Sequence, residues 1–176
     1  MDAKIGVVTI SDRAFAGIYE DESGPAVIDT LKQIISSKWT PITKLIPDEK
    51  NVIENTLIEL VDSENCCLVI TTGGTGPSSR DLTPEATQNV CERMMPGYGE
   101  LMRSISLEYV PTAVLSRQTA GLRGNSLILN LPGSPKAILQ TLIPLFESIP
   151  ACIDLMDGPF IDTNEEIVVA FRPNHR

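Results

Sequence analysis

The chain has 176 residues, of which 42% are hydrophobic and 21% charged, and this composition predicts one globular domain over residues 1–176. Fourteen Lys and Arg residues against 23 Asp and Glu residues give a net charge of −9, which argues against general nucleic-acid binding. The longest apolar runs are too short to cross a bilayer and no signal-peptide segment precedes the first of them, so we expect a cytoplasmic protein that binds no membrane.

Short apolar runs alternate with helical patterns along the chain. Strands are expected at 5–10, 42–46, 66–72 and 126–131, with a further edge strand at 167–170. Helices are expected from near Ser23, after Asp48 and Thr83 as capping residues, over 99–109, and from about Lys136. Because the strands are unbroken apolar runs, the pattern predicts an α/β fold of three layers, with a mostly parallel central sheet covered by helices on both faces.

Each of the four main strands runs into a polar or glycine-containing loop. Ligands of open α/β sheets bind outside the carboxyl ends of the strands, where such loops meet. The sequence therefore predicts one binding site at one edge of the sheet, formed by Ser11-Asp12-Arg13, Pro47-Asp48, the segment from Gly73 to Asp81, and Pro132-Gly133-Ser134.

The loop after the third strand is rich in glycine. Glycines can turn the backbone with positive φ and present consecutive amide N–H groups to an anion, although a turn made for packing reasons would have the same composition. Neither the Gly-Lys-Ser/Thr ending of a Walker loop nor the dinucleotide-binding spacing is present. Polar side chains crowded into the loop favour binding; the candidates here are Thr72, Gly73, Gly74, Thr75, Gly76, Ser78 and Arg80.

Asp48 and Asp81 end two neighbouring strand–loop units. Asp48 could instead cap the following helix, and Asp81 could hold the turn before Thr83. If both face one cleft, they suit Mg²⁺, which takes one or two carboxylates and completes its shell with waters and substrate phosphates. The start of the last main helix, at Ser134 and Lys136, could likewise be an ordinary helix start or a phosphate site.

Histidine and cysteine chemistry is not expected. The only histidine is His175, which excludes a His-assisted nucleophile within one subunit unless the tail folds back. The four cysteines lack zinc spacing and are expected to be small buried thiols. Between residues 101 and 140, four basic residues and one acidic residue give a charge of +3, which indicates either uneven surface charge or a local anion site.

In order along the chain, the motifs ISDR, LIPDE, TTGGTGPSSRDLTPEAT, PGYGE and NLPGSPK resemble those of the bacterial MogA type of molybdopterin adenylyltransferase. They are also similar to the G domains of plant and animal fusion proteins such as gephyrin. The likeness covers nearly the whole chain. One departure is visible between Leu142 and Cys152, where the chain looks shorter than we expect of this family, as though a hairpin-like insertion were missing.

The resemblance implies a homotrimer that adenylylates molybdopterin with Mg-ATP and releases pyrophosphate. It implies catalytic and Mg²⁺-binding roles for Asp48 and Asp81, and transient contacts with other enzymes of the molybdenum-cofactor pathway. Two alternatives remain, the related MoaB type and a non-catalytic molybdopterin carrier. Residues expected to bind molybdopterin or ATP are Ser11, Asp12, Thr72, Gly73, Gly74, Thr75, Gly76, Ser78, Arg80, Arg117, Pro132, Gly133, Ser134 and Lys136.

Overall fold

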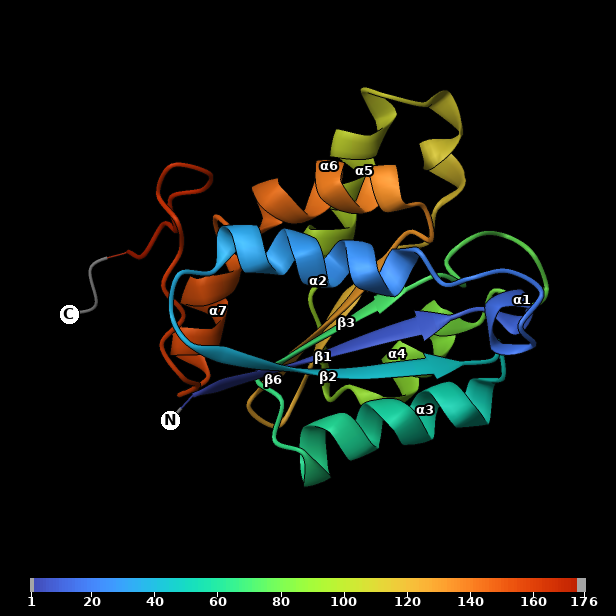
Figure 1. The fold of residues 1–176 in the computed structure, drawn as a ribbon, viewed down its shortest axis with the longest axis horizontal. Coiled ribbons are helices and arrows are strands. Elements are labelled where there is room, and N and C mark those ends of the chain that lie inside the picture. Colours follow the sequence, from blue (N-terminus) through green and yellow to red (C-terminus); the bar gives the residue numbers. More distant parts are fainter. Residues whose placement is uncertain (1, 174–176) are drawn as a thin grey trace.

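The computed structural model describes residues 2–173 as a six-stranded sheet between two layers of helices (Figure 1). The strands are β1 (Ala3–Ile10), β2 (Trp39–Ile46), β3 (Leu68–Thr72), β4 (Arg93–Met94), β5 (Ala120–Arg123) and β6 (Ser126–Leu131). The α-helices are α1 (Asp12–Phe15), α2 (Ser23–Ile34), α3 (Lys50–Ile58), α4 (Thr83–Val90), α5 (Pro96–Leu107), α6 (Pro135–Leu145) and α7 (Ile149–Leu155). Short π and 3-10 helices follow α3 (Glu59–Ser63) and α5 (Pro111–Leu115).

The strand order is β2-β1-β3-β6-β5-β4, and the first four strands are parallel. The predicted three-layer α/β fold with a mostly parallel sheet is thus confirmed. The register aligns Ile10 with Ile46, Thr9 with Thr72, and Thr72 with Leu131. All four parallel strands therefore end at the same edge of the sheet, as the sequence predicted.

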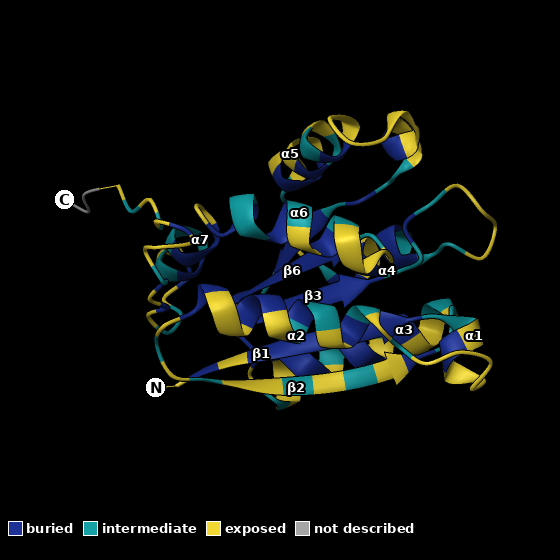
Figure 2. Ribbon diagram, turned by 45° about the horizontal axis from the view of Figure 1, so that its top comes forward, coloured by how far each residue is buried: buried dark blue, intermediate teal, exposed yellow. Residues whose placement is uncertain are grey.

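Each face of the sheet has its own hydrophobic core. On one face, α2, α5, α6 and α7 pack on alternate residues of the strands, such as Val7 and Ile70. On the other face, α3 and α4 cover Val8 and Val69. Burial on both faces explains why the central strands are apolar at nearly every position, whereas β2 at the edge of the sheet is largely exposed (Figure 2).

Several sequence predictions were wrong or incomplete. Residues 167–170 form no strand; instead, Val168 is buried in the core and Thr163 makes an isolated bridge with Ile35. The antiparallel strands β4 and β5 and the helices α1 and α7 were not predicted. Thr83 does not cap α4 from outside, because it is the first helical residue and its hydroxyl donates to the Gly73 carbonyl at 2.9 Å.

Three further predictions concern His175, the segment between Leu142 and Cys152, and membrane-spanning segments. His175 lies outside the described residues. Between Leu142 and Cys152, α6 is joined to α7 by a short turn. Within residues 2–173, no single helix has the length and apolar composition to span a membrane; α6 and α7 pass that test only as a pair, and they are bent by 57°.

Candidate active site

A pocket of about 230 Å³ lies at the carboxyl ends of β1 and β3. After β1 the chain adds β2 on one side of it and then β3 on the other side, and the helices after β1 and β2 lie on opposite faces of the sheet. Ligands of such folds bind at this topological switch point. The lining of the pocket includes seven predicted site residues, which are Ser11, Asp48, Thr72, Gly73, Gly74, Asp81 and Gly133.

The loop that follows β3, called the glycine loop, begins with two positions that only glycine can occupy. Gly73 and Gly74 have φ values of +102° and +66°. A Cβ on Gly73 would collide with the Ile10 carbonyl oxygen, and one on Gly74 would collide with the Thr83 hydroxyl. Their backbone therefore approaches β1 and α4 closely, and both residues line the pocket. The amide of Gly73 donates to the Leu131 carbonyl at 3.3 Å, which leaves the amide of Gly74 for a ligand.

The two aspartates flank this loop. Asp48 Oδ1 lies 3.2 Å from where a Cβ on Gly74 would stand, and Asp81 Oδ2 lies 2.8 Å from the equivalent point on Gly76. Asp81 Oδ2 also accepts a hydrogen bond from Ser78 N at 3.0 Å, so the expected turn-holding role of Asp81 is confirmed. The two carboxylates, 33 positions apart in sequence, thus line one pocket.

Asp48 does not cap α3, contrary to one expectation. The residue before that helix is Glu49, and Asp48 instead exchanges hydrogen bonds with Asp12. The amide of Asp12 donates to Asp48 Oδ2 at 2.8 Å, and the amide of Asp48 donates to Asp12 Oδ1 at 2.9 Å. This reciprocal pair ties the loop after β1 to the loop after β2 and holds the Asp48 side chain at the pocket.

The surroundings of Asp48 disfavour its negative charge. Burial is the main cause that raises the pKa of this carboxyl, and the negative charges of Asp12 and Asp81 raise it further. Hydrogen bonding with Asp12 and the charge of Arg80 act in the opposite direction without cancelling the rise. A cation bound beside Asp48 and Asp81 would relieve this repulsion.

Arg80 is paired with carboxylates rather than directed at the pocket. Its Nε and Nη2 donate to Asp12 Oδ2 at 3.0 and 2.7 Å, and Nη2 also reaches Glu49 Oε1 at 3.1 Å. The hydrogen bond from Arg80 lowers the pKa of Asp12. Arg80 thereby connects the glycine loop to the two loops that hold Asp48.

Arg117 stabilises the glycine loop through hydrogen bonds to the backbone of that loop. Its Nε donates to the Gly76 carbonyl at 2.9 Å, its Nη2 donates to the Asp81 carbonyl at 2.5 Å, and its backbone amide donates to Thr75 O at 2.7 Å. Its Nη1 is paired with Glu85. We expected Arg117 to contact an anion directly, and the structure gives it a supporting position instead.

The other predicted residues lie around the pocket with different contacts. Thr72 Oγ1 donates to Pro132 O at 2.7 Å, which joins β3 to the loop after β6. Ser134 precedes α6 and makes no side-chain capping bond. Ser134 and Lys136 are exposed and do not line the pocket. Arg103, Arg117 and Arg123 bond to backbone or carboxylate groups, so the basic segment does not gather its arginines into one site.

Sequence reasoning missed six residues of this pocket, which are Thr9, Ile10, Ala14, Tyr19, Asp21 and Ser23. Asp21 Oδ1 accepts from the amides of Ser23 and Gly24 at 3.0 and 3.1 Å, so it caps the start of α2. Tyr19 shares a 2.8 Å hydrogen bond with Ser11, and Ser23 Oγ donates to Gly133 O at 2.6 Å. An Asp two residues before a helical pattern is a capping signal that could have revealed Asp21, whereas nothing in the sequence pairs Tyr19 with Ser11.

The cysteines take no part in this site. Burial raises the pKa of Cys66 to about 12 and that of Cys67 to about 11, so both remain thiols at neutral pH. Across residues 2–173, no group of three or more His, Cys, Asp or Glu side chains is placed to hold a metal ion.

Comparison with known proteins gives a consistent result. Residues 6–150 match the family described as "Probable molybdopterin binding domain". A molybdopterin adenylyltransferase from Helicobacter pylori (strain ATCC 700392 / 26695) is 52% identical over 169 residues, covering 96% of both chains. One from Escherichia coli (strain K12) is 50% identical over 182 aligned positions, covering 97% of this chain and 93% of the relative. That alignment is longer than the 176-residue chain, so the Escherichia coli protein carries residues that this chain lacks.

Solved structures agree with this result but do not separate the MogA and MoaB types. The molybdopterin biosynthesis enzyme MoaB from Thermus thermophilus has a TM-score of 0.82 at 38% identity, covering 91% of this chain and 99% of that one. A MogA structure has a TM-score of 0.81 at 34% identity, covering 87% and 99%. The curated relatives, at 50% identity or more over nearly full length, make the distinction. The chain belongs to the molybdopterin-binding family and, within it, to the molybdopterin adenylyltransferases.

Proposed function

We propose that the chain transfers the adenylyl group of ATP to the terminal phosphate of molybdopterin at the pocket between β1 and β3. A phosphate oxygen of molybdopterin attacks the α-phosphorus of ATP and forms a new P–O–P linkage. The bond between the α-phosphorus and the oxygen that bridges it to the β-phosphorus breaks, and pyrophosphate leaves. The observation that carries this proposal is the meeting of Asp48, Asp81 and the glycine loop in one pocket of a chain with this family membership.

The pocket supports a mechanism of positioning and charge neutralisation. Bringing a phosphate monoester against a triphosphate is electrostatically unfavourable, so the protein must orient the two groups and balance their charge. The amide of Gly74 can bind a phosphate oxygen, and the hydroxyl group of Ser11 lies at the same pocket. This arrangement needs no covalent nucleophile.

Asp48 and Asp81 are the proposed Mg²⁺ ligands. Two carboxylates with waters and substrate phosphates make an oxygen-only set that suits Mg²⁺, and the unfavourable charge of Asp48 beside Asp81 fits a cation between them. When bound, Mg²⁺ supplies positive charge against the phosphates. Asp12 orients Asp48 through their reciprocal hydrogen bonds, and Arg80 orients Asp12.

Asp81→Asn tests this proposal most directly. The amide can still accept the Ser78 hydrogen bond, so the loop keeps its turn, but the charge needed to hold Mg²⁺ is lost. We expect kcat for adenylyl-molybdopterin formation to fall by at least about a hundredfold, a typical loss for a group that stabilises charge in the transition state. Thermal denaturation of the same samples is the control, and turnover near that of the wild type would remove Asp81 from the mechanism.

A molybdopterin carrier is the second candidate. A carrier gains little from acidic side chains beside an anionic ligand, so Asp48 and Asp81 favour the enzyme. Incubation of the purified protein with molybdopterin and Mg-ATP separates the two, because only the enzyme forms pyrophosphate in a molybdopterin-dependent and Mg²⁺-dependent way. Tight molybdopterin binding without product, beside an active control enzyme, would support the carrier.

A further inference from the structure

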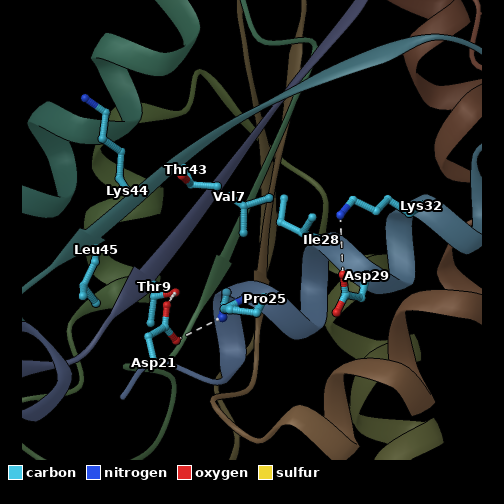
Figure 3. A pocket seen from close by; sticks show the side chains of 11 residues that line it. Val7, Thr9, Asp21, Pro25, Ile28, Asp29, Lys32, Thr43, Lys44 and Leu45 are labelled. Atoms are coloured by element: carbon cyan, nitrogen blue, oxygen red, sulfur yellow. Dashed lines mark hydrogen bonds and ion pairs between the residues drawn. The ribbon is translucent and has the colours of Figure 1, made fainter. Parts of the chain in front are cut away.

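A second cavity of about 430 Å³ opens beside the active-site pocket, between α2 and the strands β1 and β2 (Figure 3). We call it the α2–β2 cavity. Its size falls within the range of about 300–1,000 Å³ that is typical of small-molecule sites. The residues that matter most for its chemistry are Val7, Thr9, Ile28, Asp29, Thr43 and Leu45.

The cavity exists because α2 does not extend over the edge strand. Val7 and Thr9 of β1 lie buried beneath the helix, whereas Thr43 and Leu45 of β2 are exposed on the same face. At its start, α2 approaches the sheet so closely that a Cβ on Gly24 would stand 2.6 Å from Thr9 Oγ1. The helix and the edge strand thus form two walls with β1 between them.

The lining suits a flat ring that carries a few polar groups. Val7, Ile28 and Leu45 supply aliphatic surface, and the Thr9 and Thr43 hydroxyl groups lie among them. At one end, the Asp29 carboxylate lies 3.6 Å from the Lys32 ammonium, which places a hydrogen-bond acceptor beside a donor. An amino group next to a ring nitrogen or carbonyl has the complementary pattern.

The α2–β2 cavity and the active-site pocket share a wall. Thr9 and Asp21 line both, and Thr9 Oγ1 donates to Asp21 Oδ2 at 2.7 Å. A ligand with its phosphate at Gly74 in the active-site pocket therefore has an apolar cavity directly beside that phosphate.

We propose that the α2–β2 cavity binds the aminated bicyclic ring of a substrate whose phosphate lies in the active-site pocket. This inference rests on the proposed function, because molybdopterin and ATP each join a nitrogen-containing bicyclic ring to phosphate. Their shared ring chemistry is what the lining recognises. The experiment below determines which of the two rings occupies the cavity.

Leu45→Trp fills the cavity and tests this inference. Thr40→Trp is the matched control, because Thr40 is an exposed residue of the same strand that does not line the cavity and alternates to the other face. Equilibrium dialysis with AMP and with molybdopterin measures ring-dependent binding, and inhibition by pyrophosphate measures phosphate binding. We expect Leu45→Trp to weaken one of the two ring ligands by at least about tenfold, the scale of one altered apolar pocket, with pyrophosphate inhibition unchanged.

Asp29→Asn is the second variant. It removes the acceptor charge at the rim without filling the cavity, and we expect it to weaken the same ligand as Leu45→Trp does. Wild-type turnover with unchanged affinities for AMP and molybdopterin in Leu45→Trp would overturn the ring site and leave the proposed function intact. A wild type that neither turns over nor binds either ligand would overturn the proposed function as well. A changed oligomeric state in Leu45→Trp with unchanged ring binding would also overturn the ring site, because the cavity would then be a subunit contact.

Discussion

At the scale of single residues, the least expected feature is the line of contacts from Arg80 through Asp12 to Asp48. The guanidinium of Arg80 bonds with the carboxylates of Asp12 and Glu49, and its positive charge also lowers the pKa of Asp48. Each member therefore acts on the next: Arg80 stabilises the charge of Asp12, and Asp12 holds the side chain of Asp48 in place.

This line of contacts predicts a change in the pH dependence of Arg80→Gln. Because the charge of Arg80 lowers the pKa of Asp48, its removal leaves burial, Asp12 and Asp81 to raise that pKa further. If turnover needs the Asp48 carboxylate, activity falls as pH drops through this pKa, so the acid limb of the kcat profile moves to higher pH. We expect a several-fold relative loss on the acid side and a smaller loss at alkaline pH.

Arg80→Lys is the matched control, since it keeps the charge but not the two-pronged hydrogen bond to Asp12. Its acid limb should stay closer to that of the wild type. If kcat of Arg80→Gln fell equally at every pH and the acid limb of its pH profile stayed where it is in the wild type, Arg80 would act only by holding the loop.

At the scale of elements, the glycine loop is stabilised by a residue that lies far along the chain. Arg117 precedes β5 and bonds to the carbonyls of Gly76 and Asp81, so one side chain holds both ends of the loop's second half. Glu85 on α4 completes this contact, and its Oε2 is buried without a partner among the described residues.

Arg117→Lys should show how much this contact contributes. A lysine keeps the charge but cannot reach Gly76, Asp81 and Glu85 together, because it lacks the planar guanidinium. We expect the free energy of unfolding to fall by about 1–2 kcal/mol, the scale of one or two lost hydrogen bonds to a charged group. We also expect KM for ATP to rise. Urea denaturation and steady-state kinetics measure the two effects; an unchanged KM with lower stability would mean that the contact serves the fold alone.

The elements also show where sequence reasoning succeeds and where it stops. The four parallel strands and their loops were predictable because buried strands leave unbroken apolar runs, as in β3 and β6. The strand β4 has two residues and β5 has four, too few for any periodicity. Asp48 was predicted to cap α3 from its position alone, but its partner is Asp12, 36 residues away, and local spacing carries no information about such a pair.

At the scale of the whole molecule, exposed apolar side chains gather along α5 and the 3-10 helix after it. Leu107, Tyr109, Val110, Val114 and Leu115 are between 44% and 66% exposed. Figure 2 shows this part of the chain as largely exposed beyond the main body of the sheet. A monomer would leave this apolar surface in water, which is consistent with the homotrimer that the family resemblance implies.

Light scattering coupled to size-exclusion chromatography measures the oligomeric state directly. We expect a mass three times that of the 19.1 kDa chain at micromolar concentration. Val114→Asp, which places a charge within the exposed apolar surface, should shift the protein toward monomer if that surface forms the contact. A wild-type protein that remains a monomer on dilution and on concentration would contradict the trimer.

The aligned ends of the four parallel strands have a consequence for synthesis of the chain. The pocket needs Ser11, Asp48, Gly73 and Gly133, and β6 is the last of the four strands to be made. A ribosome-bound chain that stops before Gly133 therefore lacks one wall of the pocket, however well its first three parallel strands have paired. Substrate binding by chains of increasing length should appear only after that residue has left the exit tunnel, so the ligand reports completion of the sheet.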